Sequence, residues 1–141
     1  MFSSRTMLPD DWNGLQNFKA SEFKHPEKMG YEFMVWLDKV RTLANVPMFV
    51  SSSYRDPGHN KAVHGAKDSA HSDIPCNAVD IRMAPTADDP NWNLARYRIQ
   101  AAAQALGCIR IGIYLSGSMH LDRTEDRRPA PRFWIAVDNP A

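Results

Sequence analysis

Three residues in this chain carry side chains that zinc commonly binds. His71 opens the stretch HSDIPCNAVDIRM, Asp80 lies in the strand-like second half of that stretch, and His120 lies in another strand-like run, SMHLD. Catalytic zinc sites take three protein ligands, drawn from imidazole nitrogens and carboxylate oxygens, and leave a fourth position to water. The residue types are therefore those of a catalytic zinc site.

Asp80 also needs a partner on simpler grounds, because a carboxylate inside an apolar strand costs free energy unless another group pairs with it. A zinc ion held by His71, Asp80 and His120 would neutralise the charge. A salt bridge from Asp80 to Arg82 or Arg110 would do so equally, and composition alone favours this second answer. His71 would then lie in solvent.

The composition is that of one globular domain. The chain has 141 residues, 43% of them hydrophobic, and we expect a single domain over residues 1–141 with an irregular N-terminal arm at 1–16. The net charge of +1 lacks the basic excess of nucleic-acid binders, so we expect no nucleic-acid partner. The chain has no apolar run long enough to span a bilayer, so we expect no membrane partner either.

Two further features bear on the compartment. The N-terminal stretch MFSSRTMLPDDWNG lacks the apolar segment of a secretory signal peptide, so we expect synthesis in the cytoplasm. Two cysteines, Cys76 and Cys108, are too few for a disulfide framework, and we predict two reduced thiols.

Apolar periodicity predicts two helices. Residues 31–44 repeat apolar side chains at three- and four-residue spacing, with Trp36 among them, which indicates a helix packed on a core. The second helix is expected to begin with Asp89 as N-cap and Pro90 at its first position, and to end at Gly107. Its predicted buried stripe is Leu94, Tyr97, Ala101 and Ala105.

The remaining apolar runs predict strands at 48–54, 78–83, 109–114, 118–122 and 132–137. The residues LSG between the third and fourth of these indicate a hairpin turn. Together the elements predict an α+β fold with two main helices on a small antiparallel sheet. Adjacent strands of such a sheet can aim Asp80 and His120 at one point from one face.

Several short blocks occur in an order that resembles the zinc D-alanyl-D-alanine carboxypeptidase and hedgehog-type peptidase family, in particular its short phage and bacterial peptidoglycan-peptidase branch. The blocks are NFKASEF (17–23), VSSSYRDPGHNKAVHGAKDSAH (50–71), AVDI (78–81), IRIGIY (109–114) and MHLD (119–122). Several blocks in order are more specific than any single motif. The resemblance extends over residues 17–137 and implies the fold of that family.

The resemblance implies roles for individual residues. It places the zinc ligands at His71, Asp80 and His120. It places at Arg55 an arginine that binds a substrate carboxylate or the developing oxyanion, a task that suits a planar guanidinium. Ser53 and Ser69 fall on serines that could support the substrate-binding side of the site through hydrogen bonds.

The chain also departs from the family. Gly117 stands where the best-known members carry a glutamate as general base, although murein endopeptidases of this branch also lack it. The loop between His71 and Asp80 is longer than usual. His64 replaces the first glycine of a pair, and Asp56 stands where some relatives have a cysteine.

Two residues could take over proton handling. Asp122 lies two positions after His120 in a strand and so points to the same face. It could serve as the base or, as we expect more strongly, as a partner that orients the imidazole of a ligand. His64 could donate to the oxyanion, although it could equally be a surface histidine.

The other aromatic and charged residues have simpler expected roles. We expect Trp36, Trp92, Phe133 and Trp134 in the core, although an exposed tryptophan near the cleft could stack on a sugar or a stem peptide. The charge-rich segment 123–132 is expected to be a solvated loop, although it could border the cleft.

The resemblance implies a zinc peptidase that hydrolyses an amide bond in peptidoglycan stem peptides or cross-bridges. It further implies a phage endolysin or a virion-associated lytic protein, with virion proteins as partners, acting from the virion or released to the cell wall at lysis. The alternative is a non-catalytic, zinc-containing structural or cell-wall-binding virion protein on the same scaffold. Gly117 keeps that alternative open.

Overall fold

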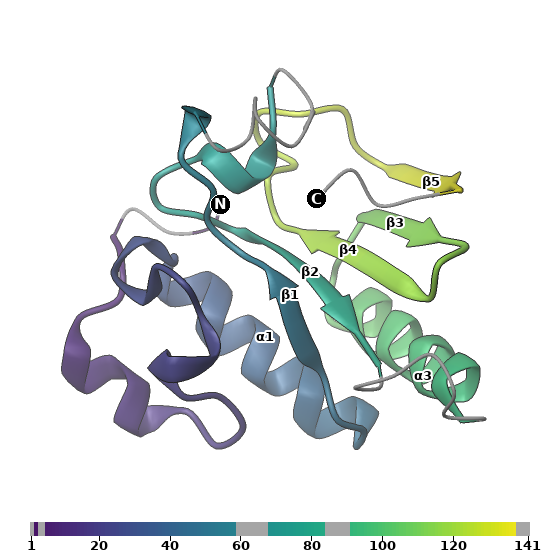
Figure 1. The fold of residues 1–141 in the computed structure, drawn as a ribbon, viewed down its shortest axis with the longest axis horizontal. Coiled ribbons are helices and arrows are strands. Elements are labelled where there is room, and N and C mark those ends of the chain that lie inside the picture. Colours follow the sequence, from purple (N-terminus) through teal and green to yellow (C-terminus); the bar gives the residue numbers. More distant parts are fainter. Residues whose placement is uncertain (1, 3–4, 59–67, 84–90, 138–141) are drawn as a thin grey trace.

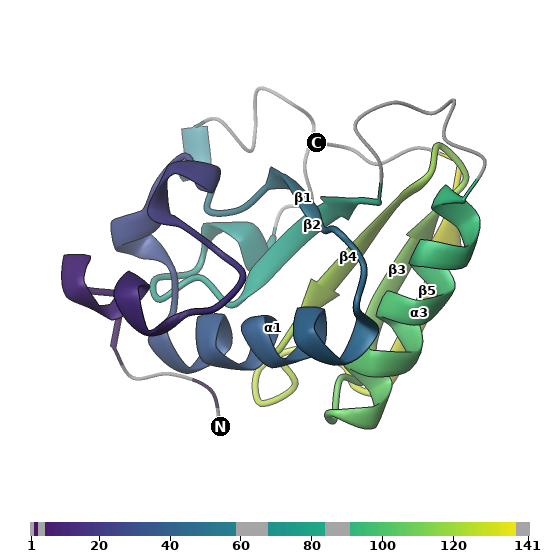
Figure 2. The same ribbon diagram turned by 90° about the horizontal axis from the view of Figure 1, so that it is seen from below.

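The chain folds into a five-stranded sheet with two main helices on one side of it (Figures 1 and 2). The computed structural model describes residues 2, 5–58, 68–83 and 91–137. The α+β class expected from the sequence is confirmed. None of the helices in these ranges is long and apolar enough to cross a membrane.

Helix α1 (Tyr31–Ala44) has the predicted bounds and supplies the centre of the core. Five of the six apolar residues of its stripe are buried: Phe33, Met34, Trp36, Leu37 and Val40. The sixth, Leu43, is 55% exposed, whereas its neighbour Ala44, the last residue of the helix, is buried in the core. The helix ends at Asn45, whose left-handed backbone (φ 55°) is typical of a residue that terminates a helix.

Helix α3 (Trp92–Ala105) is present, but its predicted buried stripe is wrong. Leu94 and Tyr97 are exposed, and the helix buries Ile99, Ala102 and Ala103 instead. Several alanines in a row satisfy the helical period in more than one way, so the pattern did not determine which of them faces inward. The expected cap at Asp89 and Pro90 lies outside the described residues.

The strands are β1 (Phe49–Ser52), β2 (Ala78–Arg82), β3 (Arg110–Tyr114), β4 (Ser118–Asp122) and β5 (Arg132–Ala136), in the order β1-β2-β4-β3-β5. Three of the pairings are antiparallel, and residues 115–117 form the expected turn between β3 and β4. The fourth differs from the expectation, because β5 runs parallel to β3 and makes the sheet mixed. The connection 123–131 passes the start of β3, so β5 begins at the end of the sheet where β4 finishes.

The two faces of the sheet differ in chemistry. The face toward the helices buries apolar side chains of β2, β3 and β4, among them Val79, Ile111 and Leu121. The opposite face carries Asp80 and His120, which alternate with those apolar residues along the same strands. Polar residues of this face are therefore held by strands whose other side is anchored in the core.

The matched pair Leu37 and Leu43 tests this description of the core. Leu37→Ala removes a fully buried side chain and should lower the free energy of unfolding by about 2–5 kcal/mol. Leu43→Ala, on the exposed face of the same helix, should lower it by less than about 0.5 kcal/mol. Equilibrium unfolding in urea measures both, and equal losses would contradict the assigned helix face.

Candidate metal centre

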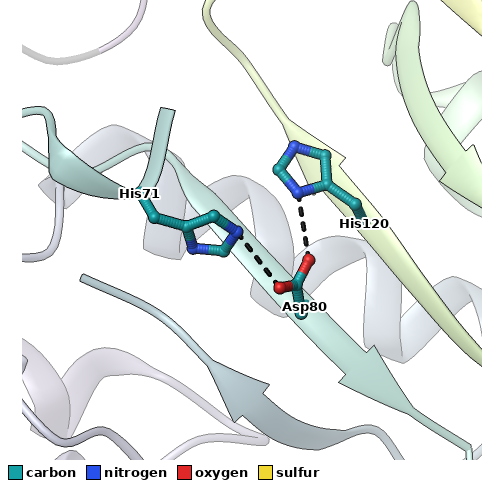
Figure 3. A group of neighbouring side chains, drawn as sticks. All are labelled: His71, Asp80 and His120. Atoms are coloured by element: carbon teal, nitrogen blue, oxygen red, sulfur yellow. Dashed lines mark hydrogen bonds and ion pairs between the residues drawn. The ribbon is translucent and has the colours of Figure 1, made fainter. Parts of the chain in front are cut away.

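Three buried side chains from separate parts of the chain converge on the polar face of the sheet (Figure 3). Asp80 on β2 lies directly opposite His120 on β4 in the antiparallel register. His71 comes from the short 3-10 helix η4 (Ala70–Ser72), which Ser69 caps by accepting the backbone N–H of His71 at 3.2 Å. One potential ligand atom from each of the three lies within 4.8 Å of the others, so the group could hold a metal ion.

The imidazole of His71 is oriented by a backbone carbonyl. Its Nδ1 lies 2.7 Å from the carbonyl oxygen of Ser53, and because a carbonyl only accepts, Nδ1 must carry the proton and donate. Its Nε2 faces Asp80 Oδ2 at 3.2 Å but is buried with no hydrogen bond to any residue within 5–58, 68–83 and 91–137. In the neutral imidazole this nitrogen presents a lone pair to a carboxylate, an arrangement that a cation between them would satisfy.

His120 is oriented in the same way by a carboxylate. Its Nε2 lies 2.6 Å from Asp122 Oδ2, and its Nδ1 faces Asp80 Oδ1 at 3.0 Å. Hydrogen bonds from the outer nitrogen of a ligand histidine to a carboxylate or a carbonyl are typical of metal sites. Both imidazoles thus turn their inner nitrogens toward Asp80, and the donor set of two nitrogens and a carboxylate fits zinc.

Burial and neighbouring charges shift the pKa values of Asp80 and His120 in opposite directions. Burial alone would raise the pKa of Asp80, but the two imidazoles outweigh it and hold the pKa well below its ordinary value. Burial would lower the pKa of His120, but the carboxylates of Asp122 and Asp80 outweigh it and raise the pKa to about 9. Asp80 therefore stays ionised at neutral pH, in a place that water cannot solvate.

Asp122 has the contacts of an orienting partner. Its Oδ1 accepts hydrogen bonds from Arg110 Nε at 2.8 Å and from both the backbone N–H and the hydroxyl of Thr124, at 3.1 and 2.7 Å. Its Oδ2 contacts His120, and the side chain is fully buried. Each oxygen is thus engaged inside the protein, which leaves the carboxylate poorly placed to take a proton from a water in the cleft.

Arg55 lies beside the three side chains and has unused donors. Its guanidinium is buried, with Nη2 3.5 Å from Ser69 Oγ, while Nε and Nη1 have no hydrogen-bond partner among the described residues. Burial lowers the pKa of this guanidinium, although nearby Asp80 opposes the effect. Unpaired buried donors are rare in folded proteins, so a ligand with acceptor oxygens is the natural partner for Arg55.

These groups open onto a cleft of about 600 Å³. Its walls include Arg55, Arg110, Tyr114, Arg128 and Trp134. The expectation that segment 123–132 is a solvated loop is wrong for Arg128, whose guanidinium binds Asp68 and Asp73 and is nearly buried. Trp92 is half-buried and packs against the core, whereas Phe133 is 52% exposed and does not lie in the core as predicted.

The long loop between His71 and Asp80 is held from two sides. Arg127 and Arg128 each bind Asp73, with closest distances of 2.7 Å. On the other side the backbone of Cys76 pairs with residues 28–30, through hydrogen bonds of 2.8 and 2.9 Å. The extra length is thus fixed in place rather than projecting freely.

Both cysteines are free and buried, as predicted. Burial raises the pKa of the Cys76 thiol to about 12, so it stays protonated at neutral pH and is a poor metal ligand. His64 lies outside the described residues.

The sequence interpretation missed the contribution of β3 to the cleft. Arg110 and Tyr114 lie on the cleft face, two positions either side of Gly112, which pairs with His120. The alternation R-I-G-I-Y carries this signal, because every second residue of a strand shares a face. Trp134, expected in the core, lines the same cleft from β5.

Comparison with protein families gives one match. The family model described as Peptidase M15 matches residues 13–122, which is more than half of the chain. The matched segment contains Arg55, His71, Asp80, His120 and Asp122. Comparisons with curated proteins and with solved structures found no match.

The contacts of Asp122 predict the effect of replacing it. Asp122→Asn should weaken zinc binding about 10- to 100-fold, because the amide is uncharged and can turn its NH₂ group toward His120, which disturbs the tautomer in which Nδ1 is free to bind metal. Competition with a chromophoric chelator measures the affinity. Asp126→Asn, an exposed change in the next segment, is the control and should bind as the wild type does.

The raised pKa of His120 predicts how the stability of the metal-free protein depends on pH. A group with a folded-state pKa above its unfolded value of about 6.5 stabilises the fold fully below pH 6.5 and loses that contribution as the pH rises through 9. Chelator-treated protein should therefore unfold in less urea at pH 9.5 than at pH 6. His120→Gln should flatten this dependence, and an unchanged slope would count against the assigned interactions.

Proposed function

Because the chain belongs to the peptidase M15 family, we propose that it is a zinc metallopeptidase that hydrolyses an amide bond in peptidoglycan stem peptides or cross-bridges. Peptidases of this family depend on zinc. The observation that carries the proposal is the buried group His71, Asp80 and His120 at the wall of the cleft. One nitrogen of each imidazole is held toward the carboxylate of Asp80, because the other nitrogen is bound by Ser53 or Asp122.

In this proposal His71 Nε2, a carboxylate oxygen of Asp80 and His120 Nδ1 would hold the zinc ion. When bound, zinc supplies polarisation of the scissile carbonyl and a water of lowered pKa. Ser53 and Asp122 keep the two imidazoles in the tautomers that zinc binding needs.

Arg55 binds the substrate. Its unpaired Nε and Nη1 supply donors for a carboxylate of the peptide or for the oxygen that gains negative charge during hydrolysis. The hydroxyl of Ser69 contacts the guanidinium of Arg55. Ser53 contributes through its backbone carbonyl, which orients His71, rather than through its hydroxyl. Two other cleft arginines, Arg110 and Arg128, are already paired with aspartates, so Arg55 and Arg132 are the cleft arginines that favour a substrate with negative charge.

Proton handling must differ from that of relatives with a glutamate before the last ligand. Gly117 occupies that position with φ +104°, a conformation that side-chain-bearing residues rarely adopt, and it lies in the turn between β3 and β4. A glutamate there would strain the turn. Asp122 is engaged by four contacts, so its role is to orient His120, and His64 remains a candidate for oxyanion stabilisation.

The role as an endolysin or virion-associated lytic protein stays a prediction from the family resemblance. The same holds for virion proteins as partners. Gly117 is the specific observation that favours the second candidate, a zinc-containing wall-binding or structural protein that does not cut.

One experiment tests the proposal. The wild type should contain zinc and should release new amine termini from purified peptidoglycan, with the bond identified by mass spectrometry of the fragments. His120→Ala should lose both properties, because it removes one ligand and exposes the charge of Asp80. His25→Ala, which removes a partly exposed histidine outside the cleft, is the control and should keep both.

The outcomes separate the two candidates. Zinc without new amine termini would leave the non-catalytic candidate standing. Absence of zinc from the wild type would refute both.

A further inference from the structure

A single row of residues crosses four strands of the sheet on its cleft face. Asp80 pairs with His120, His120 pairs with Gly112, and Gly112 pairs with Trp134 on β5. The metal centre therefore occupies one end of this row and an indole the other. Gly112 is the one member between them, and it has no side chain.

Gly112 is required for space. A Cβ atom added there would lie 2.4 to 2.6 Å from Cε2, Nε1 and Cζ2 of Trp134, far inside contact distance. The indole thus lies directly on the backbone of β3 and extends across that strand toward β4. Its ring centroid reaches 5.3 Å from that of His120, with an angle of 46° between the planes.

The indole is fixed in this position. Its Nε1 donates a hydrogen bond to the hydroxyl of Tyr114 at 3.3 Å. The guanidinium groups of Arg110 and Arg132 lie 5.8 and 5.1 Å from its ring centroid. The ring remains only half-buried and lines the cleft. It is the largest apolar surface in a cleft whose other large side chains are mostly arginines and acids.

Core packing does not account for this tryptophan. Its neighbours Phe133 and Ile135 lie on the other face of β5 and are largely exposed, so this edge strand is not buried in a core. Trp134 also lies beyond residues 13–122, the segment that matches the peptidase family. In the part of the chain that the structure describes, the exposed side of the indole is therefore available to a partner from outside the protein.

We propose that Trp134 is a substrate-contacting residue whose indole, seated on Gly112, holds an aliphatic residue of a short anionic peptide beside the metal centre. This inference rests on the proposed peptidase function and names the part of the substrate that the cleft recognises. The aliphatic side chain packs on the indole face, while carboxylates of the same peptide lie near the arginines.

Four variants test the proposal with a synthetic stem peptide of peptidoglycan as the probe. Trp134→Ala should raise KM about tenfold, which corresponds to the loss of one aromatic contact, with a smaller change in kcat. Trp134→Phe should recover most of this loss. Gly112→Ala should resemble Trp134→Ala although the tryptophan is still present, because the added Cβ displaces the indole. Gly14→Ala, which has open space around its Cβ, is the matched control.

Zinc content and melting temperature separate binding from support of the fold. Unchanged zinc content together with a raised KM in Trp134→Ala and Gly112→Ala supports the proposal. An unchanged KM in zinc-loaded Trp134→Phe and Trp134→Ala overturns it, and so does a loss of activity that follows the loss of zinc alone.

A binding titration keeps this test separate from the test of hydrolysis. Addition of the uncleaved peptide to wild-type protein should change the tryptophan fluorescence, and Trp134→Phe should abolish the change. A wild type that binds in this way but does not hydrolyse would refute the peptidase and leave the role of Trp134 standing. Hydrolysis by the wild type with no effect of the Trp134 variants would refute the role of Trp134 alone. If the wild type neither hydrolyses nor binds the peptide, both fail.

Discussion

The buried carboxylate of Asp80 is the constraint around which the polar face of this protein is organised. It lies in a strand between two others, where water cannot solvate it, and two imidazoles face it from η4 and β4. Each imidazole is held by an acceptor on its far side, the Ser53 carbonyl or the Asp122 carboxylate. Asp122 in turn is held by Arg110 and Thr124, so the network extends outward from Asp80 through His120 to a second buried carboxylate.

The loop between His71 and Asp80 is held in a position that serves this network. The loop between His71 and Asp80 is longer than is usual in the family, and a longer loop could let His71 move relative to Asp80. Ion pairs from Arg127 and Arg128 to Asp73, and backbone pairing of Cys76 with residues 28–30, prevent that movement. Residues 28–30 and 127–128, which are remote in sequence, thus help to keep His71, Asp80 and His120 in position. The N-terminal part of the chain therefore contributes to the support of the site.

Short sequence patterns predicted the features of the fold that depend on residues close together in the chain. The bounds of α1 followed from its apolar period, and the convergence of Asp80 and His120 followed from neighbouring strands with side chains on one face. The inward face of α3 could not be predicted, because alanines contribute little to either choice. The parallel pairing of β5 depends on where the connection 123–131 passes, which strand periodicity does not encode. The sequence predicts a buried Trp134 because a large apolar side chain favours the core. The actual position of the indole, across β3, depends on the missing side chain of Gly112 on the neighbouring strand.

The strand order has a consequence for synthesis of the chain. Strand β2 carries Asp80, but its inner neighbour β4 is synthesised only after α3 and β3. The arginines that clamp the loop before β2 come later still. A nascent chain that ends before residue 120 therefore lacks one imidazole, and the central carboxylate has no complete set of partners. Completion of the polar face is a late event in translation, and until then the edge of β2 that pairs with β4 lacks its partner strand.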